Sequence, residues 1–305
     1  MATPQTGIFA LGDASHTYLE FSLNGDAAPA ELVTKIVDIH EPHTTVGGAN
    51  FVIGFRPELW RRVAPDCAPA ELTGFNEPLQ GARGYTMPAT QSDAWTWIAG
   101  SSYDVVFDLA KDVINALDGV ATLDREIVGW SYRHSRDLTG FEDGTENPSL
   151  LEAPAVATIP AGAPGAGGSI LLFQQWRHDW KRWNALSDEK QEKVMGRTKP
   201  DSVQLEDDVM PSDAHVPRNV IVVDGNELDI FRRNVPYGSV VDHGTVFVGF
   251  GADQYRLDRM LRRMAGAEDG VRDALTFYST PLTGAYYFVP PVDALLSFKT
   301  PEEDD

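Results

Sequence analysis

The chain has 305 residues and carries 25 Lys and Arg against 45 Asp and Glu, which gives a formal net charge of −20. Its apolar content of 42% is too high for a disordered chain, and its negative charge argues against nucleic acid or an anionic membrane surface as a partner. A single cysteine, Cys67, excludes an intrachain disulfide and a cysteine-based zinc or iron–sulfur site.

The opening residues contain no basic segment followed by an apolar core, and no apolar run approaches the ~18 residues that a membrane helix needs. We therefore expect no signal peptide, no contact with membranes and a cytoplasmic location.

Strand-like and helix-like segments alternate through the first half. The clearest helix has an apolar stripe of Val106, Leu109, Val113 and Leu117, and Gly119 follows it. The expected strands are 17–23, 50–55, 95–101 and 125–133, and the expected helices are 30–40 and 104–117.

The second half repeats roughly the same order of elements. Its best helix places Leu257, Met260, Leu261 and Met264 on one face, with Gly266 after it. The expected strands are 169–176, 219–223, 227–233, 245–250 and 285–289, and the expected helices are 187–195 and 255–265.

A segment rich in proline and glycine separates the halves. Residues 153–169 contain three prolines and four glycines, a composition that disfavours a helix and is typical of a linker. We predict an N-terminal domain at 1–150, a linker at 151–168 and a C-terminal domain at 169–305. Each domain has the order β-α-β-β-α-β, so the predicted class is α+β with two ferredoxin-like halves.

Three separate segments contain residues that could carry chemistry. His215 precedes an apolar run and has carboxylates nearby, which would suit the axial ligand of a metal cofactor. Asp143 lies in a glycine-bracketed acidic turn, either solvated or held at a cavity wall. Arg232 ends an expected strand, either buried with an anion partner or exposed at the strand end.

The other histidines fit surface or structural positions better, because no pair has the spacing of a helical metal site. They are His16, His40, His43, His134, His178 and His243.

These three segments together resemble the dye-decolourising peroxidase family, and most closely its bacterial B-type group. Residues 140–144 (GFEDG) match the Gly-x-x-Asp-Gly signature, 213–218 (DAHVPR) resemble the segment of the proximal haem histidine, and 232–238 (RRNVPYG) resemble that of the distal arginine. Their order and their separations, 72 residues from Asp143 to His215 and 17 more to Arg232, also agree with the family.

The resemblance implies a role for each residue. His215 would bind the haem iron, Asp143 would move a proton between the oxygens of hydrogen peroxide, and Arg232 would stabilise the charge that develops as the O–O bond breaks. Less direct roles would fall to four more residues: Asn234 orders a distal water, Arg218 pairs a haem propionate, Glu227 (or Asp213) accepts a hydrogen bond from His215, and Phe247 lines the pocket.

The implied fold is a barrel-like α+β arrangement of the two halves, with one haem b per chain in the C-terminal half. The implied activity reduces hydrogen peroxide to water through a ferryl haem and oxidises dyes, phenolic or other organic reductants or metal ions. The resemblance also implies a homo-oligomer, and the acidic end of the chain does not look like an encapsulin-targeting tail.

Two alternatives stay open. One is a haem-handling protein, a haem carrier or an iron-extracting deferrochelatase, which would need neither Asp143 nor Arg232 above the iron. The other is a hydrolase that uses Glu142 and Asp143, but adjacent residues on an extended chain point apart.

Overall fold

The computed structural model describes residues 2–39, 48–133 and 136–301. His40, His43, His134 and the last acidic residues, 302–305, lie outside these ranges. Within them, no helix is long and apolar enough to cross a bilayer.

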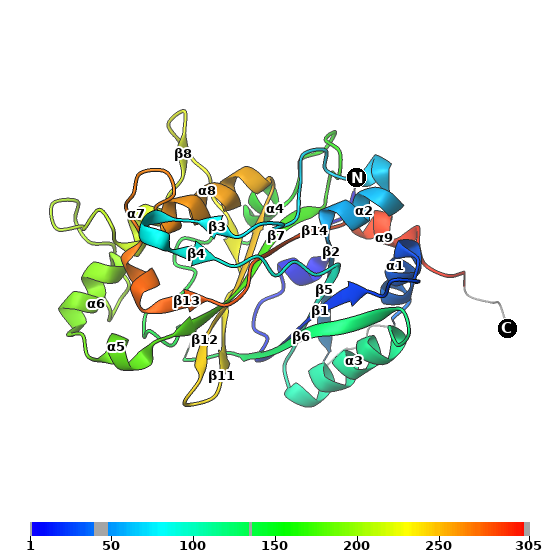
Figure 1. Ribbon diagram of the computed structural model, residues 1–305, viewed down its shortest axis with the longest axis horizontal. Coiled ribbons are helices and arrows are strands. Elements are labelled where there is room, and N and C mark those ends of the chain that lie inside the picture. Colours follow the sequence, from blue (N-terminus) through cyan, green and yellow to red (C-terminus); the bar gives the residue numbers. More distant parts are fainter. Residues whose placement is uncertain (1, 40–47, 134–135, 302–305) are drawn as a thin grey trace.

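A closed antiparallel barrel forms the centre of the described structure (Figure 1). The strand order β12-β11-β6-β1-β5-β2-β14-β7 returns to β12, so each half contributes four strands to one closed sheet. The bounds are β1 (Ser15–Leu23), β2 (Ala49–Phe55), β5 (Ala94–Gly100), β6 (Ala121–Trp130), β7 (Ser169–His178), β11 (Val235–Gly238), β12 (His243–Gly251) and β14 (Ala285–Val289).

The two halves meet at two short seams. Phe288 of β14 pairs with Phe55 of β2, and Tyr237 of β11 pairs with Gly129 of β6. Gly129 fits this seam because an added Cβ would lie 2.6 Å from a methyl group of Val235. The seams confirm the predicted α+β class with two joined halves.

Some helices pack on the outside of the barrel, and others lie at one end of the molecule (Figure 1). The long ones are α1 (Pro29–Val37), α3 (Tyr103–Ala116), α6 (Asp188–Met195) and α8 (Gln254–Ala265). The short elements are α2 (Pro57–Val63), α4 (Ala153–Ala157), α5 (Trp180–Asn184), α7 (His215–Asn219), α9 (Val292–Leu296), β3 (Leu79–Gln80), β4 (Thr86–Met87), β8 (Val222–Val223), β9 (Asn226–Glu227), β10 (Phe231–Arg232) and β13 (Ser279–Pro281).

Two hydrophobic cores follow from the alternation of side chains along the strands. In β1, Leu19 and Phe21 belong to the outer core under the helices, whereas Tyr18 points into the barrel. The barrel interior is aromatic, and Tyr18 lies within 5.4–6.3 Å, centroid to centroid, of Trp95, Trp97 and Phe173.

Three local predictions are wrong. The expected strand 219–223 is preceded by the one-turn helix α7 and shrinks to β8, and the expected strand 227–233 breaks into β9 and β10. The segment 153–169 holds α4, because Pro154 at its start suits a helix and Ala153 and Ala157 are buried. The division into two domains with a linker stays a prediction.

Candidate active site

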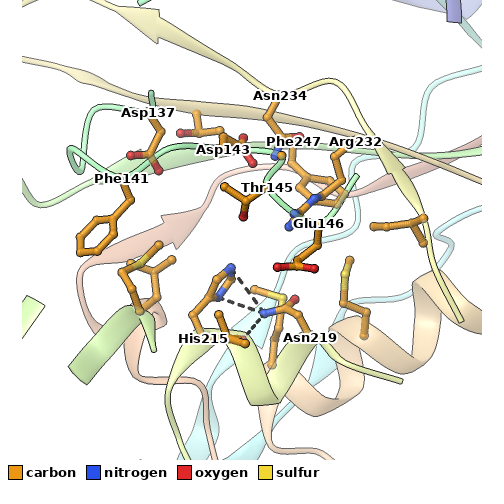
Figure 2. Close-up of a pocket in the computed structure, with 18 of the residues that line it drawn as sticks. Asp137, Phe141, Asp143, Thr145, Glu146, His215, Asn219, Arg232, Asn234 and Phe247 are labelled. Atoms are coloured by element: carbon orange, nitrogen blue, oxygen red, sulfur yellow. Dashed lines mark hydrogen bonds between the residues drawn. The ribbon is translucent and has the colours of Figure 1, made fainter. Parts of the chain in front are cut away.

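A cavity lies between α7, α8 and β12, and the loop 137–146 and β10 form its opposite wall (Figure 2). Figure 2 shows His215 on one side and Asp143, Arg232 and Asn234 on the other. The structure thus brings the three predicted segments to one cavity, although they are far apart in sequence.

His215 begins α7 and is fixed by a buried carboxylate. Its Nδ1 lies 2.7 Å from Oδ2 of Asp273, which is 0% exposed and also accepts a hydrogen bond from the Leu275 amide at 2.8 Å. A proton on Nδ1 donated to Asp273 leaves Nε2 with its lone pair, the form in which histidine binds a metal. Asp273, not Glu227 or Asp213, is therefore the carboxylate partner of the His215 ring. The Nδ2 of Asn219 lies 3.1 Å from Nδ1 and 3.4 Å from Nε2 of the same ring (Figure 2).

The opposite wall is locked to β10 by Asn147. The Asn147 Nδ2 donates to the Arg232 carbonyl at 2.8 Å, and the Arg232 amide donates to the Asn147 Oδ1 at 2.9 Å. Gly144, with φ of +78°, turns the chain between Asp143 and this anchor. The reciprocal pair thus holds the loop of Asp143 against the strand of Arg232.

Asn234 also lines this wall, and its Oδ1 accepts a hydrogen bond from the Val248 amide at 2.9 Å. That bond uses the oxygen, so the Nδ2 donors stay available to the cavity. An amide group here can therefore donate to a ligand or water on the same side as Asp143 and Arg232.

A second carboxyl group stands beside Asp143 and was not predicted from the sequence. Asp137 lies next to Asp143 in Figure 2, and its Oδ1 accepts hydrogen bonds from the Thr139 amide at 2.9 Å and from the Thr139 hydroxyl. Burial raises the pKa of Asp137 to about 6; the hydrogen bonds from Thr139 oppose the shift and the charge of Asp143 adds to it. Two carboxyl groups with different environments are typical of sites that move protons.

The rest of the cavity wall is mostly apolar. Phe247 lines it, as predicted, together with Leu228, Ile230, Met195, Met260, Leu261 and Met264. An apolar slot with one available imidazole nitrogen on one side and polar groups on the other matches the requirements of haem.

Two predicted ligand residues differ in placement. Glu227 lines the cavity, and burial together with the charges of Asp229 and Glu146 raises its pKa. Arg218 does not line it: its Nη1 and Nη2 donate to the Asp269 carboxylate at 2.7 and 2.9 Å, and its side chain is buried. The guanidinium of Arg218 is therefore engaged by the Asp269 carboxylate, and its pairing with a haem propionate stays a prediction.

His178 is another cavity residue that sequence reasoning did not select. Its Nδ1 lies 2.9 Å from the Ser279 hydroxyl and its Nε2 lies 3.1 Å from the Thr245 hydroxyl. Burial, with a smaller contribution from His243, lowers the pKa of His178 to about 4, so its ring is neutral. The position of His178 at the end of β7 does not indicate from the sequence that it lines the cavity.

Comparison with known proteins agrees with this geometry. The family model described as Dyp-type peroxidase, N-terminal, matches residues 33–131, and the model of the C-terminal part matches residues 134–294. The "Dye-decolorizing peroxidase" of Mycolicibacterium paratuberculosis is 38% identical over 84% of this chain and 77% of its own length. That of Rhodococcus erythropolis is 34% identical over 96% of this chain and 88% of its own.

Solved structures agree as well. A DypB variant of Rhodococcus jostii in complex with heme superimposes with a TM-score of 0.89 at 36% identity and covers 97% of this chain and 98% of its own. A putative dyp-type peroxidase of Shewanella oneidensis gives a TM-score of 0.91 at 28% identity, covering 98% of this chain and all of its own. With both halves matched, this chain belongs to the Dyp-type peroxidase family and is a haem-dependent peroxidase.

Proposed function

We propose that the cavity holds one haem b, with Nε2 of His215 as the axial ligand of the iron and Asp143, Arg232 and Asn234 on the peroxide side. The observation that carries the proposal is the opposition of His215, fixed by Asp273, to this polar wall across an apolar slot. Haem would supply the redox chemistry that no side chain of the site provides.

Asp143 would act as the acid–base group. Its carboxylate would take the proton from one oxygen of hydrogen peroxide and return it to the other, so that water can leave. The anchor of Asn147 to Arg232 supports this role, because it holds the loop in place without using the Asp143 side chain.

Arg232 would stabilise the negative charge that develops on the departing oxygen. Its backbone is paired with Asn147, and its guanidinium forms no ion pair within the described residues, so its charge is available to the cavity. Asn234 would orient the water or peroxide between the two charged groups.

Asp273 would keep His215 in the required tautomer and make its ring more basic, which favours high oxidation states of the iron. Glu227 and Phe247 would contact the haem from the cavity wall. The electrons would come from dyes, phenols or other organic reductants.

The haem-handling alternative is less well supported. A carrier would need His215 and an apolar slot, but it would gain nothing from a carboxylate and an arginine on the opposite wall. We also propose a homo-oligomer in the cytoplasm, which size-exclusion chromatography and cell fractionation would test.

The axial assignment is tested by reconstitution with haem. The wild-type protein should show an intense Soret band, and His215→Ala should lose or strongly shift it, whereas the control His243→Ala, at the start of β12, should not. An unchanged spectrum of His215→Ala would refute the assignment.

The peroxide-side assignment is tested by stopped-flow absorbance after mixing with hydrogen peroxide. Arg232→Ala should bind haem but react about 100- to 1000-fold more slowly, by analogy with the loss of an oxyanion donor. Asp143→Ala under the same conditions shows which residue dominates. The exposed Arg62 of α2 offers a control, Arg62→Ala. A wild-type rate for Arg232→Ala would exclude its catalytic role.

A further inference from the structure

A second cavity adjoins the peroxide-side wall. It has a volume of about 630 Å³ and shares the wall residues Asp137, Asp143, Gly144, Arg232 and Asn234 with the first cavity. The rest of its lining comes from residues 11–14, 131–133 and 233–236 with His16, Arg136 and Asn147. The two cavities therefore meet at this shared wall.

Four arginines line this second cavity in a chain of net charge −20: Arg133, Arg136, Arg232 and Arg233. In the described part of the chain none of them has a carboxylate oxygen within 4.0 Å of its side-chain nitrogens. The arginines that do form ion pairs are Arg56, Arg125, Arg197, Arg218, Arg256, Arg259 and Arg262. This cavity is thus lined by four arginine side chains that form no ion pair within the described residues.

Two of these arginines donate hydrogen bonds to backbone carbonyls and still have N–H groups without an acceptor among the described residues. Arg136 donates to the carbonyls of Gly140 and Pro200, both at 2.8 Å, and of Lys199 at 3.2 Å. Arg233 donates one bond of 2.8 Å to the Ile8 carbonyl and stacks on Trp97 at 4.9 Å. A guanidinium has five N–H donors, so each keeps hydrogen-bonding capacity for an acceptor in the cavity.

His16 adds an unpartnered buried donor. His16 lines the cavity and is only 2% exposed. Its Nδ1 accepts a hydrogen bond from the Trp97 indole N–H at 3.2 Å, and its Nε2 has no hydrogen-bond partner among the described residues. Acceptance at Nδ1 places the proton of the neutral ring on Nε2. Burial and the charge of Arg233 lower the pKa of His16 to about 4, against a smaller opposing effect of the Asp13 backbone, so this neutral form holds at physiological pH. A buried N–H without an acceptor is costly unless a ligand or water satisfies it.

Carboxylates also line the cavity, but burial weakens their charge. Asp13 and Asp137 both have pKa values raised by burial, that of Asp137 to about 6, and Asp143 is the third acid. Four guanidinium groups therefore face three carboxyl groups, of which Asp137 is protonated in part near neutrality. The surplus of charge and of donors favours an anion.

We propose that the second cavity is a binding site for an aromatic carboxylate with a phenolic hydroxyl group, the reductant of the peroxidase. Its carboxylate would bind to Arg133, Arg233 and the Nε2 of His16, and its ring would lie against Leu11 and Pro236. The guanidinium of Arg133 stacks on the Tyr132 ring at 5.2 Å. The proposal rests on the proposed haem site, because the shared wall of Asp143, Arg232 and Asn234 places the reductant beside it.

The reaction balances with hydrogen peroxide as the oxidant. Each bound phenol gives one electron to the peroxide-oxidised protein and its O–H proton to water, and it leaves as a phenoxyl radical. Two phenols supply the two electrons that, with two protons, reduce one hydrogen peroxide to two waters.

The test compares ferulate with its neutral amide. Isothermal titration calorimetry on the haem-loaded protein should show saturable one-to-one binding of ferulate and binding of the amide at least about tenfold weaker, since charge-assisted hydrogen bonds to arginine are lost. The KM values for oxidation of the two compounds should differ in the same direction.

Two variants shift the cavity charge in opposite directions. Arg133→Gln should weaken ferulate binding about tenfold, and Asp13→Asn should strengthen it, while binding of the amide changes little in both. The matched control is Arg62→Gln, because Arg62 is exposed and α2 contributes no residue to either cavity. Opposite shifts cannot arise from a general loss of structure.

The proposal would be overturned if ferulate and its amide bound equally well. It would also be overturned if Arg133→Gln kept the wild-type affinity for ferulate, or if Arg62→Gln lost as much affinity as Arg133→Gln. These outcomes differ from a failure of the proposed function, which would appear in the wild type without ferulate as a missing Soret band or a missing reaction with peroxide.

Discussion

The buried carboxyl group of Asp137 should make the unfolding free energy depend on pH. Its pKa is raised from 3.8 to about 6 in the folded protein, so the unfolded chain ionises more readily. Ionising Asp137 therefore costs the folded state no stability below pH ~3.8. The loss of unfolding free energy grows as the pH rises and is complete above pH ~6. Two pKa units correspond to about 3 kcal/mol of unfolding free energy. Asp137→Asn should remove this penalty, because the amide oxygen can still accept from Thr139.

Urea unfolding of the variant and the wild type at equal haem content measures the effect. The variant should be more stable by about 3 kcal/mol at pH 7.5 and by only about 1 kcal/mol at pH 4.5. Asp66→Asn, at an exposed position, should change little at either pH. A variant that is less stable than wild type at pH 7.5, or a gain independent of pH, would refute the reasoning that burial holds the Asp137 proton.

Three further predictions concern contacts described above. Asp273→Asn should keep haem but shift the Soret band and raise the reduction potential, because His215 loses its anionic partner; an unchanged potential would contradict this. Asn147→Ala should bind haem normally yet react with peroxide at least about tenfold more slowly, since the loop of Asp143 loses both bonds to Arg232; a wild-type stopped-flow rate would exclude this anchor. Tyr287→Phe should lower the unfolding free energy by about 1–3 kcal/mol, because Glu20, which is 1% exposed, loses a hydrogen bond of 2.6 Å; equal urea midpoints would argue against it.

Periodicity was sufficient for much of the fold. The stripes on α3 and α8 and the segments of β1, β2 and β12 appear within a few residues of their predicted bounds. Each of these helices buries one apolar face, and each of these strands places buried side chains in the outer core and in the barrel interior. The segment after His215 failed because its apolar run looks like a strand, while α7 precedes it and packs on α8. The local sequence pattern does not show that α7 gains tertiary contacts with α8.

The partners within the site were harder to predict than its main residues. Asp143, His215 and Arg232 lie in recognisable motifs, but Asp273 follows His215 by 58 residues and meets it only through the fold. Arg218 shows the same dependence on the fold: it is close to His215 in sequence, whereas its ion-pair partner Asp269 lies beyond α8. Asp137 and His16 have no local signal because burial alone gives them their properties.

Net charge and local charge make opposite predictions for an anionic reductant. At low salt the charge of −20 should slow the approach of ferulate, whereas the four unpaired arginines act only near the cavity. Raising NaCl from about 10 to about 200 mM shortens the screening length from ~30 to below 10 Å. We therefore expect the association rate of ferulate, measured by stopped-flow fluorescence, to rise and its dissociation rate to rise as well, with the neutral amide unaffected in both. An association rate that falls with salt would show that the arginines already dominate the field at long range, and that the net charge of the chain does not govern encounter.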